Sequence, residues 1–252
     1  MSDESIFYLN VPDEEPVRHK NNFIKTAVCE LKFPTLLELE ESPPVKMQKL
    51  LRKNYPYYSK GTSVGISEAG PSTLGKKYLF ESKRRDWVIS LRTSAISLET
   101  SKYTEFEEFF ERLEELLVIS KNLLDTDFFT RIGLRYINII PIDDTDLNGW
   151  LNPVLLTTPV SEQLGTLSQF SAEFRGFIKR GQYAVKHGFP PRSNPSEPIS
   201  KYYLDFDHYS EGVEYNDALE LVKDFNKTNY SIFLWSLGEK AKDKLGEGSY
   251  KS

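Results

Sequence analysis

Two stretches of this chain, residues 27–124 and 131–238, show the same order of predicted secondary structure. Each runs from a strand through a helix and several strands into a long amphipathic helix. The last strand before the long helix recurs at a regular interval, since Leu98 and Leu204 lie 106 positions apart. Because each strand alternates apolar and polar residues, each has one face to bury. We therefore expect an α+β fold with a curved antiparallel sheet, helices on one face and two pseudo-equivalent halves.

Three segments are expected along the chain. Residues 1–22 form a polar, acidic arm with the composition of a linker. Residues 23–126 form the first α+β half and residues 127–252 form the second. The two halves are expected to make one compact unit, because 252 residues are within the size of a single large domain.

In the first half, the clearest element is the amphipathic helix Thr104–Leu124, whose apolar residues recur every three or four positions. Thr104 and Glu107 at its start have the spacing of a capping box, in which the two side chains accept from backbone N–H groups. A second helical segment, Leu36–Tyr55, is interrupted by prolines within Ser42–Pro44. The strands predicted in this half are Thr26–Phe33, Ser63–Glu68, Lys77–Glu81, Trp87–Arg92 and Ala95–Thr100.

In the second half, the final helix is predicted over Asn216–Leu237, again with an apolar stripe. A short helix is expected near Leu147–Leu156, and Gly188–Pro198, with its four prolines, predicts a long loop. The strands predicted in this half are Arg131–Ile140, Leu167–Ile178, Gln182–His187 and Tyr202–Tyr209. This architecture resembles the pseudo-duplicated helix-grip and TATA-box-binding-protein-like folds, a resemblance of fold that carries no function by itself.

Charge and cysteine content exclude several classes of protein. The net charge is −5, from 32 Lys and Arg against 37 Asp and Glu, so no general positive field is available to recruit nucleic acid or an acidic membrane. The single cysteine, Cys29, excludes an internal disulfide framework. No apolar run has the length of a membrane span or the form of a signal peptide. The cytoplasm is therefore the expected location.

Three motifs stand out in the sequence. They are KTAVCELKF at Lys25–Phe33, FTRIGLRYIN at Phe129–Asn138 and YLDFD at Tyr203–Asp207. With these motifs, most of the chain resembles a sporadically distributed family of uncharacterised prokaryotic proteins of similar length, and the central RIGLRYIN-type motif is the most specific. The family has no established activity, but its scattered distribution is similar to that of mobile defence or toxin–antitoxin genes. The resemblance therefore implies a component of such a module.

Strand alternation places four charged residues on the side of their strands that faces away from the apolar residues. Arg131 and Arg135 share one face of the strand that opens the second half, and Asp205 and Asp207 share one face of the strand before the final helix. We expect these residues to line the helix-free face of the sheet as a candidate binding site, because guanidinium groups offer paired donors to carboxylate or phosphate. The alternative is that the arginines and aspartates pair with each other across strands as structural ion pairs.

Basic residues also gather at two predicted hairpin turns, in similar places in the two halves. They are Lys83, Arg84 and Arg85 in the first turn and Lys179 and Arg180 in the second. A nucleic-acid-binding protein would use them as phosphate clamps. The alternative, two solvated turns, is favoured by the acidic total charge and by the absence of a helix-turn-helix, RNA-recognition or zinc-finger signature.

Signatures of enzymes are few. The sequence lacks the GxxxxGK[ST], GxGxxG and HExxH motifs. Asp13, Glu30 and Lys32 have the residue types of a PD-(D/E)xK metal nuclease, but Asp13 falls in the arm, which favours coincidence. The pair Asp205 and Asp207 has no third acid nearby in the sequence to complete a metal site. We therefore predict no catalytic residue, no metal site and no cofactor.

The sequence thus favours a non-catalytic binding or regulatory protein that acts on another protein, without membrane association. Two alternatives stay open: a metal-dependent enzyme acting on phosphodiesters or nucleotides, and a nucleic-acid-binding module. These classes differ in whether ionisable residues converge in a pocket or spread over a face.

Overall fold

The computed structural model describes residues 8–67, 70–142, 146–246 and 248–249. The strands in these residues are β1 (Arg18–His19), β2 (Ile24–Lys32), β3 (Tyr57–Ser67), β4 (Gly70–Glu81), β5 (Trp87–Arg92), β6 (Ala95–Thr100), β7 (Phe128–Pro141), β8 (Phe170–Ile178), β9 (Gly181–Phe189), β10 (Lys201–Glu214) and β11 (Gly248–Ser249). The helices are α1 (Glu38–Glu41), α2 (Val45–Leu51), α3 (Phe106–Leu124), α4 (Pro153–Leu156), α5 (Ala218–Ser236) and α6 (Glu239–Leu245).

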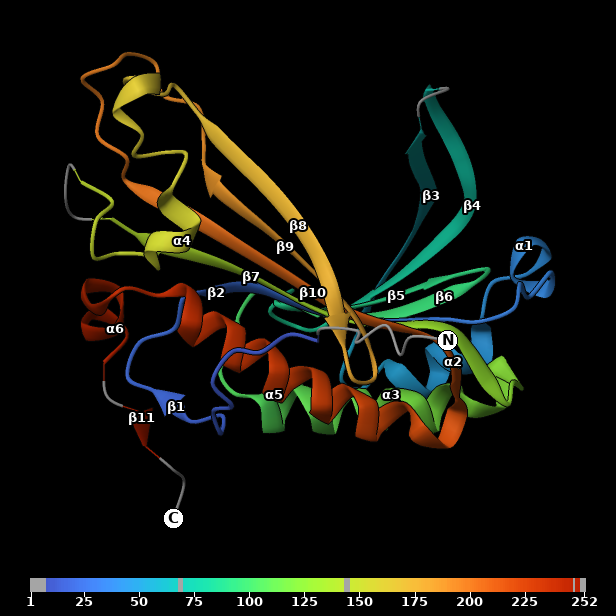
Figure 1. The fold of residues 1–252 in the computed structure, drawn as a ribbon. Helices are drawn as coiled ribbons and strands as arrows, with labels where there is room; N and C mark the ends of the chain where they lie inside the picture. The colour runs from blue at the N-terminus through green and yellow to red at the C-terminus, as the bar shows by residue number, and fades with distance from the viewer. Residues whose placement is uncertain (1–7, 68–69, 143–145, 247, 250–252) are drawn as a thin grey trace, which may run out of the picture. The chain divides into compact units, whose positions relative to one another are not determined.

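Nine of the strands in the described part of the chain form one large antiparallel sheet (Figure 1). Their order is β3-β4-β5-β6-β2-β7-β10-β9-β8, so β3 and β8 lie at the two ends and the sheet is not closed. β1 and β11 pair with each other as a separate small sheet. The predicted α+β class with a large antiparallel sheet is therefore confirmed.

Several elements differ in length from the sequence prediction. The helical segment breaks at its prolines into α1 and α2, as predicted. β3 and β4 form one long hairpin that exceeds the two predicted strands, of which Glu68 lies outside the described residues. β10 continues past Tyr209 to Glu214. Ladder hydrogen bonds hold these extensions as strand even where the side chains lack an alternating apolar pattern.

The capping box predicted at Thr104 and Glu107 is wrong. α3 starts at Phe106, and its N-cap is Glu105 in an extended conformation, with no side-chain capping hydrogen bond. Thr104 therefore lies before the cap, where its Oγ1 donates to Glu108 Oε2 at 2.7 Å instead of serving a backbone N–H. The acidic residues in the first turn still favour this helix end through the helix dipole.

The chain folds into two compact units. Unit 1 contains Met1–Lys25, Arg135–His208 and Lys223–Ser252, and unit 2 contains Thr26–Leu134 and Tyr209–Val222. The division passes through β2, β7, β10 and α5. Each unit is therefore assembled from segments that are far apart in the sequence.

The core of unit 1 lies between its strands and α5. Tyr202, Leu204 and Phe206 of β10 are fully buried and alternate with partly exposed residues, as predicted for a strand with one covered face. Ile140 of β7 and Ile232 of α5 belong to the same apolar cluster. Figure 1 shows α5, in red, running along one side of these strands. The opposite side of the strands carries the polar residues.

The core of unit 2 is covered by α3, whose predicted apolar stripe is confirmed. Phe109 and Leu113 are fully buried, and the Phe109 ring lies 5.9 Å from the ring of Trp87 on β5. The Arg112 guanidinium lies over the Trp87 ring, 4.4 Å from its centroid, so the aliphatic stem of Arg112 adds apolar cover. Burying a side chain of this size contributes about 1.5–3 kcal/mol.

Candidate functional site

On the strands of unit 1, the side chains that alternate with the core residues lie on the opposite face of the sheet. On β9, Val185 belongs to the core cluster while Lys186 is exposed, and Lys186 pairs with exposed Glu173 on β8. The same phase on the other strands defines what we term the polar sheet face of unit 1. Its residues are Arg135, Glu173, Arg175, Phe177, Lys186, Tyr203, Asp205 and Asp207.

Two of the predicted site residues meet on this face. Arg135 Nε donates to Asp205 Oδ1 at 2.7 Å and Arg135 Nη2 donates to Asp205 Oδ2 at 2.6 Å. This bidentate geometry fixes the guanidinium plane against the strand. The Asp205 side chain is 13% exposed, whereas that of Arg135 is 49% exposed. The aspartate is thus largely covered by the pair, while the arginine keeps about half of its surface open.

The other two predicted residues have different surroundings. Asp207 is half-buried on the polar sheet face. Arg131 belongs to unit 2, where its guanidinium lies 4.5 Å from the centroid of the Tyr209 ring and 4.0 Å from Glu30. It also covers the bare backbone of Gly133, since a Cβ at that glycine would come within 2.7 Å of Arg131 Nη1. Packing explains the position of Arg131 without a ligand.

The basic residues of the two hairpin turns lie where the sequence predicted. In unit 2, Arg85 adopts a left-handed backbone conformation, lies 4.9 Å from the Tyr57 ring centroid and 3.4 Å from Glu81. In unit 1, Arg180 donates to Asp224 at 2.7 Å. Acidic neighbours therefore accompany both turns, which weakens the positive field that a phosphate clamp requires.

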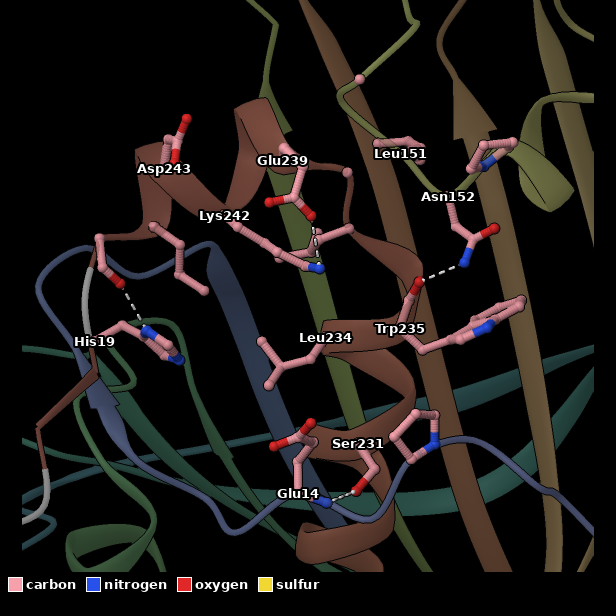
Figure 2. Close-up of a pocket in the computed structure, with 17 residues that line it drawn as sticks. Glu14, His19, Leu151, Asn152, Ser231, Leu234, Trp235, Glu239, Lys242 and Asp243 are labelled. Carbon is pink, nitrogen blue, oxygen red and sulfur yellow. Dashed lines mark hydrogen bonds and ion pairs between the residues drawn. The ribbon is translucent and has the colours of Figure 1, made fainter.

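Unit 1 also contains a pocket that the sequence did not predict (Figure 2). It has a volume of about 930 Å³ and lies between the N-terminal arm, the end of α5, the residues before α4, and α6. Leu151, Leu237 and Leu245 are buried residues of its lining, and Leu234 and Trp235, labelled in Figure 2, belong to the same lining. The lining is therefore apolar at its base.

The polar residues of the pocket come mainly from the arm and α6. Glu239 accepts from the Lys242 ammonium at 3.1 Å, and Asp243 follows on the exposed side of the same helix. Glu14, exposed on the arm, donates its backbone N–H to Ser231 Oγ at 3.0 Å. The charged side chains of the lining named here are thus three carboxylates and one ammonium, and the ammonium is already paired with one of the carboxylates.

Contacts with α5 and α6 hold the arm in place. His19 Nδ1 donates to the Gly246 carbonyl at 2.9 Å, and its Nε2 lies 2.8 Å from the Tyr230 hydroxyl. Lys227 of α5 lies 3.2 Å from Asp13. Linker composition had indicated only a surface arm, because its partners are more than 200 positions away in the sequence.

One buried histidine packs between aromatic rings without a hydrogen bond to its own ring among the described residues. His208 on β10 is fully buried between the rings of Tyr183 and Phe225, at centroid distances of 6.0 and 6.3 Å. Neither of its ring nitrogens has a hydrogen-bond partner in the part of the chain that the structure describes. Burial lowers its pKa from 6.5 to about 3. His187 is also buried, with Nδ1 2.7 Å from the Tyr202 hydroxyl, and burial lowers its pKa as well.

Two segments match or approach motifs for hydrolysis and phosphate binding, but both lie in extended strands and not in the turns or loops that these motifs require. Residues 61–65, GTSVG, match the GxSxG pattern, but they lie within the extended strand β3 instead of at a sharp strand-to-helix turn. Residues 70–76, GPSTLGK, approach the phosphate-binding pattern but lie in β4 and are followed by Lys77. Asp13, from the nuclease-like set, lies near Lys227, and Glu30 forms an ion pair with Arg92.

Within the described residues, no three side chains among His, Cys, Asp and Glu are grouped closely enough to hold a metal ion. In the same part of the chain, no helix combines the length and the apolar character needed to cross a membrane. Comparison with protein-family models finds no match, and comparison with curated proteins finds none either.

Proposed function

We propose that this chain is a non-catalytic binding protein that holds another protein on the polar sheet face of unit 1. The observation that carries the proposal is the Arg135–Asp205 pair. Its bidentate geometry fixes a half-exposed guanidinium on a rigid strand. A group ordered in advance loses little conformational entropy on binding, so it contributes more to affinity than a mobile surface arginine.

The composition of the face favours a protein over a nucleic acid. Positive charges from Arg135, Arg175 and Lys186 are matched by negative charges from Asp205, Asp207 and Glu173, so phosphates would meet repulsion as well as attraction. The face also presents Phe177, whose surface is 54% exposed, and Tyr203. Aromatic side chains and arginines are enriched at protein interfaces.

Three wider parts of the proposal concern the internal repeat, the biological role and the location. The strand order agrees with two pseudo-equivalent halves, because the strand before the long helix lies beside the opening strand twice, β6 beside β2 and β10 beside β7. The family resemblance supports a role in a prokaryotic defence or toxin–antitoxin-type module. A single buried cysteine, Cys29, agrees with a cytoplasmic location.

The test compares charge reversal at Arg135 with the same reversal at Arg84, which lies in the exposed turn between β4 and β5. Tagged wild type, R135E and R84E are used to purify partners from the native cells, with quantitative mass spectrometry as the readout. We expect R135E to lose a partner that wild type and R84E both retain. Because Arg135 also pairs with Asp205, the unfolding free energy of all three proteins is measured in urea.

Two results would contradict the proposal. If R135E loses stability and binding in proportion, the pair is a structural ion pair and the binding role is wrong. If the wild type shows Mg²⁺-dependent turnover of nucleotides or phosphodiesters that D205A abolishes, the enzyme alternative replaces it.

A further inference from the structure

Strand β8 forms one end of the large sheet and pairs on one side with β9. One contact shows which backbone groups of β8 point to its other side: Leu9 N donates to the Phe177 carbonyl at 2.9 Å. This carbonyl therefore points away from β9. Because backbone groups alternate in direction along a strand, Ser171, Glu173 and Arg175 direct theirs to the same edge. We call this side of β8 the β8 edge.

The charges along the β8 edge are self-complementary. Glu173 and Arg175 lie on either side of Phe174, and within one chain they form an ion pair of 2.7 Å. When two such edges meet antiparallel with Phe174 opposite its own copy, Glu173 of each chain lies opposite Arg175 of the other. Parallel pairing in register instead places like charges opposite each other, which is unfavourable. The edge thus selects one orientation.

We propose that the β8 edge joins a second copy of this chain, by antiparallel strand pairing about a two-fold axis at Phe174. Glu173 and Arg175 face the β8 edge with their backbone groups, so they occupy hydrogen-bonded positions of the new ladder. Phe174 occupies the non-hydrogen-bonded centre, where side chains approach most closely. Its ring is 36% exposed, so two copies can pack against each other on the opposite side from the charges.

Pairing with a second copy explains why the β8 edge is regular and carries charges of opposite sign. Edges that avoid pairing carry charged side chains, especially lysines, or prolines or bulges. Here the register of β8 with β9 is regular, and the two charges on the edge have opposite signs. Among the described residues, Leu9 makes the one backbone hydrogen bond to this edge outside the sheet, and that contact lies at the Phe177 end. An interface this short supports a dissociation constant on the order of tens of micromolar.

Charge exchange provides the test, with sedimentation velocity over a series of protein concentrations as the readout. E173R and R175E each place like charges opposite each other, so each should raise the dimer dissociation constant at least about tenfold. An equimolar mixture of the two variants should form a heterodimer, because one chain then carries two arginines and the other two glutamates. The double variant E173R/R175E should restore self-association. R84E and R135E lie off the β8 edge and should dimerise like the wild type.

The result that overturns the proposal is a wild-type protein that stays monomeric across the concentration series. A dimer that E173R and R175E leave unchanged would equally contradict it, as would a mixture that fails to associate. Far-ultraviolet circular dichroism confirms that each variant is folded. Glu173 and Arg175 also belong to the polar sheet face, so the two proposals are separated by their readouts. Sedimentation of the pure protein tests the β8 edge alone, whereas retention of another protein by R135E, which lies off that edge, tests the polar sheet face.

Discussion

Replacement of His208 by Phe should remove a large pH dependence of stability. His208 is fully buried, lies between two aromatic rings and has no hydrogen-bond partner among the described residues. Phe keeps a ring in that position. At about pH 7.5 we expect a small net effect, because removing unsatisfied polar atoms favours the variant while its larger ring costs packing energy.

The magnitude follows from the two pKa values. The pKa of His208 is about 3 in the folded protein and 6.5 ordinarily. Between those values the unfolded chain binds the proton and the folded chain does not, so the folded state loses stability as the pH falls below 6.5. At about pH 5 the loss is about 2 kcal/mol, since each pH unit below the ordinary pKa is worth about 1.4 kcal/mol. Above the ordinary pKa this stability is fully present.

The assay is urea unfolding of wild type and H208F at about pH 7.5 and about pH 5. On acidification the wild type should lose about 2 kcal/mol more than the variant. Carboxylates and His187 titrate in both proteins, so their contributions cancel in this difference. H208L serves as a second variant in case the Phe ring overpacks the site. If the stability difference between wild type and both variants is the same at the two pH values, His208 is not buried in its neutral form and the reasoning fails.

Two further predictions concern packing and capping, both measured by urea unfolding. F109A should cost about 3–5 kcal/mol, because the fully buried ring packs on Trp87 and leaves a cavity; a loss below about 1 kcal/mol would contradict the buried stripe of α3. N152A should cost about 1 kcal/mol, because the Asn152 side chain caps α4 and accepts from Val154 N. T104A should cost only a few tenths, because its hydroxyl binds an exposed carboxylate and caps no backbone group; equal losses in N152A and T104A would contradict this assignment.

Strong periodicity made much of the fold predictable. The apolar stripe of α3 and the alternation of β10 follow directly from the sequence, because helices and strands bury one face with different periods. The first residue of a helix was harder to predict. Thr104 and Glu107 have the right spacing for a capping box, but the backbone turns into the helix one residue later, a choice that local sequence leaves open.

The candidate site was predictable only in part. Alternation placed Arg135 and Asp205 on strand faces, but the pairing of β7 with β10 that brings them together depends on the whole sheet. The pocket was missed because its walls come from the arm, the residues before α4, and α6, which no local pattern connects. Its polar residues, such as Glu14 and Lys242, are ordinary surface residues in the sequence.

The contact of the arm with α6 has a consequence for the order of folding. His19 and Gly246, which it joins, are 227 positions apart. Closing a loop of that length in an unfolded chain costs about 5 kcal/mol in entropy, whereas each hydrogen bond made there returns only about 1 kcal/mol. The two ends of the chain can therefore join only after the sheet and α5 have brought them close. We therefore expect the wall that the arm gives to the pocket to form last in unit 1 and to open first, so that any molecule bound in the pocket would stabilise this final closure.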